Sequence, residues 1–258
     1  KERRECRGSR GGEIVKPEEF AEELRQVLGE RLRSVVLYGS AAAGDYLGKG
    51  SDYNLLVVVK RLGLEELKLL ARLVHDWKKA GNPAPMLFTW DRLLQSCDVF
   101  PIEILDIKEA HRILAGEDIV QKLPVALENL RHQLEYETKA RLIQLRQGFL
   151  ESEGKKRLLL RLLVSSVSSI LVLARGTLRL LGETPPAMKM PALHRLSERT
   201  GIPAEPFETV FHLKQGSLKP RSVDLEQLFG SYLAAVEHLA DFVDAFVHQA
   251  ETEKGPSD

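Results

Sequence analysis

The chain has 258 residues, 43% of them hydrophobic, enough for one large or two modest domains with substantial cores. Its 37 basic and 37 acidic side chains give a formal net charge of zero. Because no overall positive field would attract a polyanion or a lipid surface, we expect neither nucleic acid nor a membrane as a partner.

The cysteines and the apolar segments favour a cytoplasmic protein. Cys6 and Cys97 lie far apart and have no CxxC or other metal-ligand spacing, as is typical of a reduced compartment. The most apolar stretch, Leu158 to Leu181, is interrupted by arginines and serines, so we predict that it is too short and too polar to span a bilayer. We expect no secretory signal before it.

The first predicted elements are a tail and a helix. Residues 1–12 are basic and glycine-rich with nothing apolar to bury, so we expect a disordered tail there, and a second one at residues 251–258. A helix is predicted from Pro17 to Gly29, packing beneath the first strand. The apolar positions that recur in it at helical spacing are Phe20, Leu24, Val27 and Leu28.

Two apolar runs then flank a polar loop. Val35 to Tyr38 and Leu55 to Val59 are predicted to be buried strands, and the loop between them is rich in glycine and small side chains. The first run ends in Gly39-Ser40, and Asp52-Tyr53-Asn54 opens the second. This stretch holds most of the candidate functional residues.

The Gly-Ser end of the first strand has the chemistry of a phosphate cradle. Gly39 lets backbone N–H groups approach a phosphate closely, Ser40 adds a hydroxyl donor, and a helix beginning near Ala41 would point its positive end at the anion. The candidate nucleotide-binding residues are Gly39, Ser40 and Ser51.

Asp52 and Asn54 are the candidate metal ligands. They stand two apart in a strand, so both side chains leave the same face, roughly 7 Å apart at the backbone. Mg²⁺ prefers oxygen ligands and usually reaches a protein through one or two carboxylates plus substrate phosphates. Asn54 keeps an oxygen but lacks the charge. The alternative is a glycine turn between two strands, with Asp52 only capping the loop.

A strand ending in Gly-Ser, a connection of this length and a strand opening Asp-Tyr-Asn together resemble the signature of the DNA polymerase beta-like nucleotidyltransferases. The chain looks like their small bacterial branch, which includes the aminoglycoside nucleotidyltransferases, although the second aspartate of the family is Asn54 here. The resemblance implies an α+β fold: a mixed sheet flanked by helices, followed by an all-α helical bundle. It also implies Mg²⁺ and a nucleoside triphosphate, with ATP expected, and an unknown small-molecule acceptor.

After the second strand, the pattern predicts a crossover helix from Leu64 to Ala80 and a third strand from Pro85 to Trp90. Asp91 is expected to cap a short helix. Ile102 to Ile107 is predicted to be a fourth strand.

The fourth predicted strand offers two candidates for the third carboxylate that the resemblance implies. Glu103 and Asp106 would point to opposite faces of a strand, so only one of them could face Asp52. We choose Glu103 because it lies nearer the start of the strand. In the family this residue assists the attacking hydroxyl or a second metal, which gives Asp52, Asn54 and Glu103 as candidate catalytic residues.

The rest of the chain predicts helices. The long ones are Leu127 to Leu150, Lys155 to Leu181 and Leu225 to Val247, and the short ones are Pro191 to Thr200 and Pro206 to Gln215. We therefore expect a nucleotidyltransferase-like domain at residues 13–120 and a helical bundle at 121–250. The bundle would bind the acceptor or form a homodimer.

Two functions from different classes follow. The first is an enzyme that transfers a nucleoside monophosphate from NTP–Mg²⁺ to a hydroxyl of a small molecule. The second is a catalytically degenerate relative that acts as a nucleotide-binding sensor or a protein-interaction module, which the substitution at Asn54 favours. A fused HEPN ribonuclease is disfavoured, because no histidine after residue 120 follows an arginine at the required distance.

Overall fold

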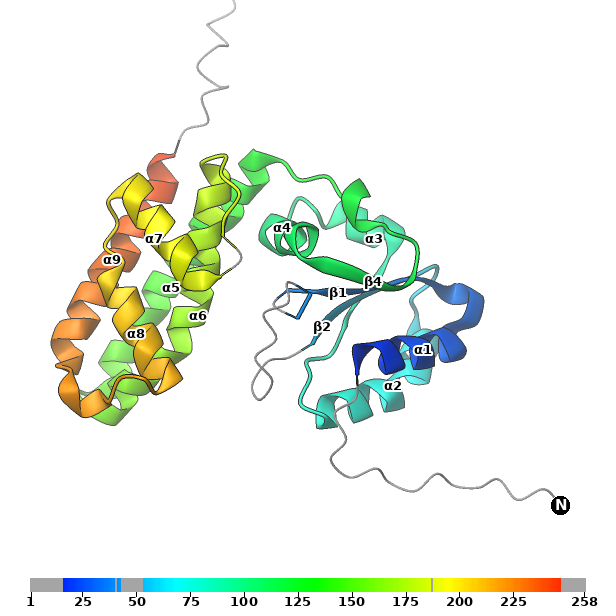
Figure 1. Ribbon diagram of the computed structural model, residues 1–258, viewed down its shortest axis with the longest axis horizontal. Helices are drawn as coiled ribbons and strands as arrows, with labels where there is room; N and C mark the ends of the chain where they lie inside the picture. Colours follow the sequence, from blue (N-terminus) through cyan, green and yellow to red (C-terminus); the bar gives the residue numbers. More distant parts are fainter. Residues whose placement is uncertain (1–15, 40, 43–52, 187, 247–258) are drawn as a thin grey trace, which may run out of the picture. The chain divides into compact units, whose positions relative to one another are not determined.

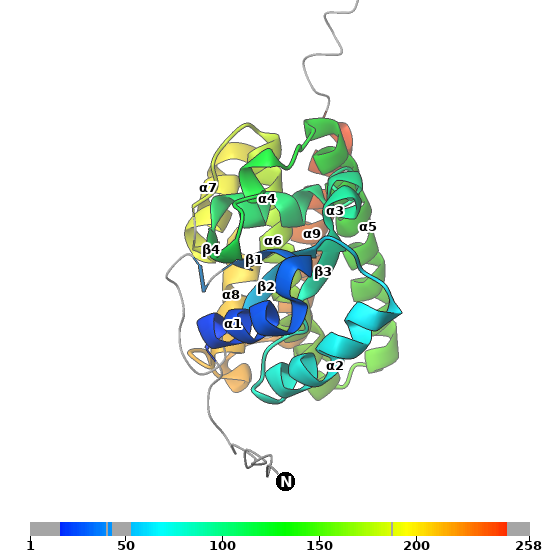
Figure 2. The same cartoon turned by 90° about the vertical axis from the view of Figure 1, so that its right-hand side faces the viewer.

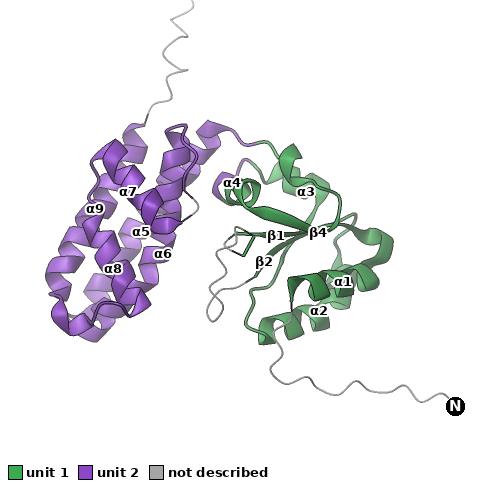
Figure 3. Cartoon of the chain, in the orientation of Figure 1, with its two compact units in different colours: residues 1–97, 103–124 green, residues 98–102, 125–258 purple. Residues whose placement is uncertain are grey.

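The computed structural model describes residues 16–39, 41–42, 53–186 and 188–246. The chain divides into two compact units: unit 1 comprises residues 1–97 and 103–124, and unit 2 comprises residues 98–102 and 125–258 (Figure 3). Unit 1 contains a four-stranded mixed sheet with flanking helices, and unit 2 is helical in its described residues, which confirms the predicted α+β class. The tails expected at residues 1–12 and 251–258 lie outside the described residues.

The sheet of unit 1 has the strand order β3-β2-β1-β4. Its strands are β1 (Leu32–Tyr38), β2 (Asn54–Val59), β3 (Met86–Thr89) and β4 (His111–Gly116). β1 pairs antiparallel with both β2 and β4, and β2 pairs in parallel with β3. The two strands that carry the sequence motif therefore lie side by side in the middle of the sheet.

One face of the sheet is covered by α1 (Pro17–Leu28) and α2 (Leu64–Lys79), as Figure 1 shows. Both predicted helices are confirmed, and α2 connects two parallel strands as a crossover. Phe20 of α1 stacks on Trp77 of α2 with ring centroids 4.3 Å apart, inside the core of this face. Val27, predicted on the apolar face of α1, is exposed instead.

The other side of the sheet carries α3 (Trp90–Gln95) and α4 (Pro101–Glu109), which two perpendicular views place opposite α1 and α2 (Figures 1 and 2). α3 is the short helix expected after the third strand, but its N-cap is not Asp91. The side chain of Thr89 accepts a hydrogen bond from the Arg92 N–H at 3.4 Å, so α3 begins two residues earlier than a cap at Asp91 predicted.

The predicted fourth strand at Ile102 to Ile107 is wrong, because these residues lie in α4. The alternation of apolar and acidic residues also fits a helix: Ile104 and Ile107, three apart, are both buried, and Pro101 stands where a helix can start. The fourth strand is instead β4, which follows α4 and pairs with β1.

Unit 2 consists of helices at the predicted places. They are α5 (Leu127–Ser152), α6 (Lys156–Leu180), α7 (Lys189–Thr200), α8 (Glu205–Gln215) and α9 (Leu225–Ala245), with a short 3₁₀ turn at Pro220–Ser222. Unit 1 has two further 3₁₀ turns, at Gly29–Arg31 and Val120–Lys122. α6 packs against the other four helices. In α9 the buried side chains lie three or four residues apart and include Leu225, Phe229, Tyr232, Val236, Leu239 and Val243.

α6 corrects one expectation about the apolar stretch. Among the described helices, α6 alone is long and apolar enough by length and composition to cross a membrane, contrary to the prediction from its arginines and serines. The core helix of a soluble protein passes the same criterion, and α6 has the buried residues Leu163, Val167 and Ile170 within unit 2.

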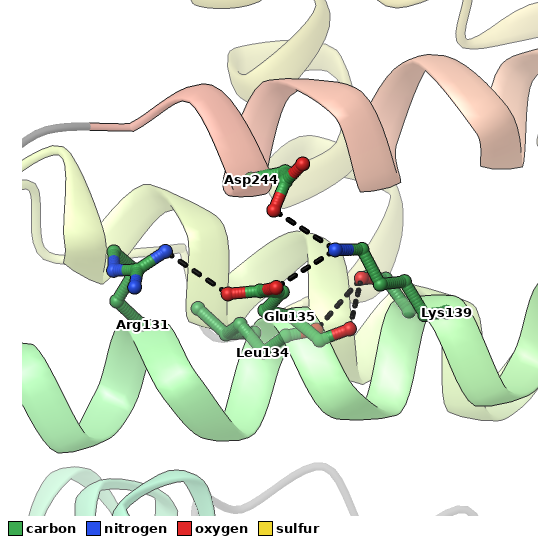
Figure 4. Close-up of polar contacts among 6 residues, drawn as sticks. Arg131, Leu134, Glu135, Lys139 and Asp244 are labelled. Atoms are coloured by element: carbon green, nitrogen blue, oxygen red, sulfur yellow. Dashed lines mark hydrogen bonds and ion pairs between the residues drawn. The ribbon is translucent and has the colours of Figure 1, made fainter.

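Ion pairs join α5 to α9 on the surface of unit 2 (Figure 4). Glu135 lies between Arg131 and Lys139 of its own helix, at 3.0 and 2.7 Å, and Lys139 also reaches Asp244 of α9 at 2.9 Å. These contacts lower the pKa of Asp244 and raise that of Lys139. Because both side chains are about half exposed, salt screens the pair, and it orients the two helices more than it stabilises them.

Candidate functional site

The end of β1 and the start of β2 bring two of the predicted site residues together. Gly39 has a φ of +79°, a conformation that favours glycine. A Cβ atom at Gly39 would lie 3.5 Å from Nδ2 of Asn54, so the Asn54 amide lies beside the glycine backbone. The motif residues Gly39 and Asn54 therefore form one corner of the sheet.

The backbone around Gly39 is already hydrogen-bonded. The Gly39 N–H donates to the Ala110 carbonyl at 3.0 Å, and the Ala42 N–H donates to the Gly39 carbonyl at 3.0 Å. Ala41 and Ala42 lie in a turn, where a helix was expected to begin. Gly39 thus contributes its conformation rather than its own N–H group. The other candidates of this loop, Ser40, Ser51 and Asp52, lie outside the described residues and stay predictions.

Three polar side chains form a row across the second face of the sheet. The register pairs Tyr38 with Asn54 on one side and with His111 on the other, so the three side chains leave the same face. The next pair confirms which face this is: Leu37 is opposite Arg112, whose guanidinium bonds Glu18 of α1 on the first face. The row therefore faces the side of α3 and α4.

The two candidate carboxylates of α4 both affect the ionisation of Tyr38, the central residue of this row. Burial raises the pKa of the Tyr38 hydroxyl to about 12, and the negative charges of Glu103 and then Asp106 add to the rise. Residues three apart in a helix share a side, so the expectation that Glu103 and Asp106 point to opposite faces is wrong. Both carboxylates lie near Tyr38, and the choice between them as the third carboxylate stays open.

His111 is a residue that the motif did not indicate. Its side chain is 14% exposed, and its Nε2 lies 3.9 Å from Oδ1 of Asp118. The same carboxylate oxygen accepts the Val120 N–H at 3.1 Å, which fixes Asp118 where β4 leaves the sheet. His111 gave no signal because the strand that carries it was not predicted, whereas Tyr38 directly precedes the Gly-Ser motif and could have been noted.

The oxygen donors at this corner are of the chemical type that binds a magnesium ion. Asn54 offers an amide oxygen, and Glu103 and Asp106 offer carboxylate oxygens, which are the hard ligands that Mg²⁺ prefers. Within residues 16–39, 41–42, 53–186 and 188–246, no three His, Cys, Asp or Glu side chains are grouped closely enough to hold a metal. A complete metal site at this corner would therefore need Asp52, nucleotide phosphates, or both.

The class of the molecule follows from its fold. The sheet is mixed, a glycine turn lies at the end of the first of its two central antiparallel strands, and helices follow in the chain. This is the nucleotidyltransferase fold. The chain is similar to spectinomycin adenyltransferase AAD(9) from Enterococcus faecialis, a structure with ATP and spectinomycin. The sequences are 11% identical, the TM-score is 0.54, and the similarity covers 84% of this chain and 97% of that one. This similarity establishes the fold.

A second solved structure, a nucleotidyltransferase-like protein from Exiguobacterium sibiricum, is 14% identical with a TM-score of 0.39, over 87% of this chain and 74% of that one. No protein-family model matches the sequence, and no curated protein matches it significantly.

Tyr38→Phe should remove part of the alkaline instability of the protein. An unfolded tyrosine ionises near pH 10 and folded Tyr38 near 12, so its stabilising contribution is complete below pH 10 and is lost as the pH rises to about 12. Tyr232, whose pKa burial also raises, acts in the same direction. Between pH 9 and 11 the wild type should lose about 1 kcal/mol more of its free energy of unfolding than Tyr38→Phe does.

Urea unfolding at several pH values measures this difference. Tyr136→Phe, at an exposed tyrosine of α5, is the control and should keep the full loss of the wild type. Equal pH dependence in the wild type and Tyr38→Phe would contradict the burial of the Tyr38 hydroxyl beside two carboxylates.

Proposed function

We propose that the protein is an enzyme that transfers a nucleoside monophosphate from a magnesium-bound nucleoside triphosphate to a hydroxyl of a small molecule. The observation that supports this most is the corner of Gly39 and Asn54, which faces the same side of the sheet as Glu103 and Asp106 within a nucleotidyltransferase fold. Phosphoryl transfer needs positioning and charge neutralisation, and this corner offers a tight glycine turn for the first and oxygen donors for a neutralising metal for the second.

The proposed reaction gives each residue a role. The hydroxyl oxygen of the acceptor attacks the α-phosphorus of the NTP, the bond between that phosphorus and the bridging oxygen breaks, and pyrophosphate leaves. The hydroxyl proton passes to a carboxylate, for which Glu103 is the first candidate and Asp106 the second. Gly39, Ser40 and Ser51 would hold the phosphates. Asp52 and Asn54 would hold Mg²⁺, which neutralises phosphate charge when bound.

The similar adenyltransferase suggests which nucleotide and which kind of acceptor to propose for this protein. The adenyltransferase with the same fold was solved with ATP and spectinomycin. We therefore propose ATP as the nucleotide, and a hydroxyl-bearing small molecule of that kind as the acceptor. Spectinomycin itself is the first compound to test.

Asn54 favours a second candidate function. An amide in place of a carboxylate lowers the charge that attracts a cation, and disturbing even an indirect contact to a metal typically costs about 10 to 100-fold in affinity or activity. The alternative is therefore a catalytically degenerate protein that binds a nucleotide as a sensor or a protein-interaction module. As a sensor, such a protein would bind the nucleotide but would not transfer the nucleoside monophosphate.

Calorimetric titration of ATP and GTP, each with and without Mg²⁺, tests both candidates. We expect magnesium-dependent binding that Asp52→Ala abolishes, and that Asp91→Ala, at an exposed carboxylate of α3, leaves unchanged. No binding at millimolar nucleotide would rule out the enzyme and the nucleotide sensor, and would leave the protein-interaction module as the remaining candidate. If binding occurs, release of pyrophosphate with spectinomycin separates them, and its loss in Glu103→Gln but not in Asp106→Asn identifies the third carboxylate.

A further inference from the structure

The side chain of Asn82 holds the start of β2. Asn82 lies in the loop between α2 and β3, and it is only 8% exposed. Its Oδ1 accepts a hydrogen bond from the backbone N–H of Tyr53 at 3.2 Å. A buried amide is costly unless it is hydrogen-bonded, so this contact fixes both the side chain and the backbone that it meets.

The loop around Asn82 is anchored in the core of unit 1. Its own N–H donates to the Trp77 carbonyl at 3.4 Å, and the Trp77 indole Nε1–H donates to the Pro83 carbonyl at 2.8 Å. Trp77 is 1% exposed and stacks on Phe20, and the Tyr53 ring lies 6.1 Å from the Trp77 ring. Asn82 therefore connects a rigid part of the core to a single backbone N–H.

The register explains why the start of β2 needs this contact. β3 pairs with β2 only from Leu56 onward, where Leu56 is opposite Met86. Tyr53 and Asn54 precede that pairing. Before β3 begins, the Asn82 side chain accepts the hydrogen bond of the Tyr53 N–H. On the other side, Asn54 is held by its pairing with Tyr38.

We infer that Asn82 is a positioning residue of the nucleotide site, which acts through the Tyr53 backbone on Asn54, the proposed metal-ligand position that directly follows it. A backbone fixed at Tyr53 sets the direction in which Asn54 leaves the sheet, beside Gly39. This inference rests on the proposed function, because it assigns that position to Mg²⁺.

Three variants separate positioning from stability. Asn82→Ala removes the acceptor, and Asn82→Asp keeps an oxygen in the same place. Leu24→Ala, at a buried residue of α1 in the same core, lowers the stability by leaving a cavity and changes neither Asn82 nor Trp77. The measurements are the hydrogen-exchange rate of the Tyr53 amide, the Kd of ATP–Mg²⁺ by calorimetry, and the Tm of each variant.

We expect Asn82→Ala to speed exchange of the Tyr53 amide about tenfold and to weaken ATP–Mg²⁺ binding about 10 to 100-fold. Asn82→Asp should bind within about threefold of the wild type, and Leu24→Ala should bind like the wild type despite a lower Tm. Wild-type binding in Asn82→Ala, or an equal loss in Leu24→Ala, would overturn the inference.

Failure of the proposed function gives a different result. If the wild type binds no nucleotide, that function is wrong, and the exchange rate of the Tyr53 amide alone decides whether Asn82 holds this backbone. Faster exchange in Asn82→Ala supports the positioning role, and unchanged exchange overturns it.

Discussion

Asn54→Asp is expected to strengthen magnesium-dependent ATP binding by about 10 to 100-fold, because it restores a charged oxygen ligand beside the glycine turn. Without ligand the variant should be less stable than the wild type. The new carboxylate would face the same side of the sheet as Glu103 and Asp106, whose charges already raise the pKa of Tyr38. Magnesium and nucleotide should reverse that loss, because binding only to the folded state raises the Tm.

Thermal unfolding and calorimetry, each with and without ATP–Mg²⁺, check this expectation. Asn54→Ala, which removes the amide and adds no charge, is the matched control and should bind no better than the wild type. If Asn54→Asp gains no affinity while the wild type binds nucleotide, Asn54 does not occupy a metal-ligand position.

Gly116→Ala is expected to destabilise unit 1 by about 3 to 5 kcal/mol. Gly116 has a φ of +80°, and an added Cβ would lie 2.0 Å from the Arg33 carbonyl oxygen and 3.0 Å from Cα of Ser34. Both atoms belong to the backbone of β1, beside the point where its register with β4 shifts. The overlap can be relieved only by moving the central strand that carries Tyr38 and Gly39.

Gly29→Ala is the control for backbone strain alone. Gly29 also has a positive φ, +53°, but a Cβ there meets no atom within 4 Å. Its substitution should cost about 1 to 3 kcal/mol, the usual range for a strained backbone conformation. Denaturant unfolding that shows equal losses for the two variants would contradict a close contact between Gly116 and β1.

The elements that sequence patterns predicted well are those with long and unambiguous periodicity. The apolar spacing in α2 and α9 continues over several turns, the run of β1 ends just before Gly39, and that of β2 begins at Asn54. Residues 102–107 were ambiguous because apolar residues fall both at alternate positions and three apart, and only packing decides between strand and helix. Because residues 102–107 were predicted to be a strand, β4 was not predicted. For the same reason, Glu103 and Asp106 were expected on opposite faces rather than on the same side of a helix.

The residues of the candidate site also differ in whether a sequence pattern could identify them. Gly39 and Asn54 were identified from a local motif, which a sequence displays directly. Tyr38, His111 and Asn82 belong to this corner through strand register and a loop contact between distant residues, which no local pattern encodes. The role of Asp118 beside His111 likewise depends on where β4 ends.

The placement of the two tryptophans gives the sheet an intrinsic optical reporter at each end. Trp77 lies beside Tyr53, next to Asn54, within the range of fluorescence energy transfer from the tyrosine. The Arg33 guanidinium carbon lies 4.6 Å from the centroid of the Trp90 ring. Trp90 therefore lies near the opposite end of β1. Changes in tryptophan emission that arise at the Gly39 corner should therefore come from Trp77, while Trp90 reports on the far end of the sheet.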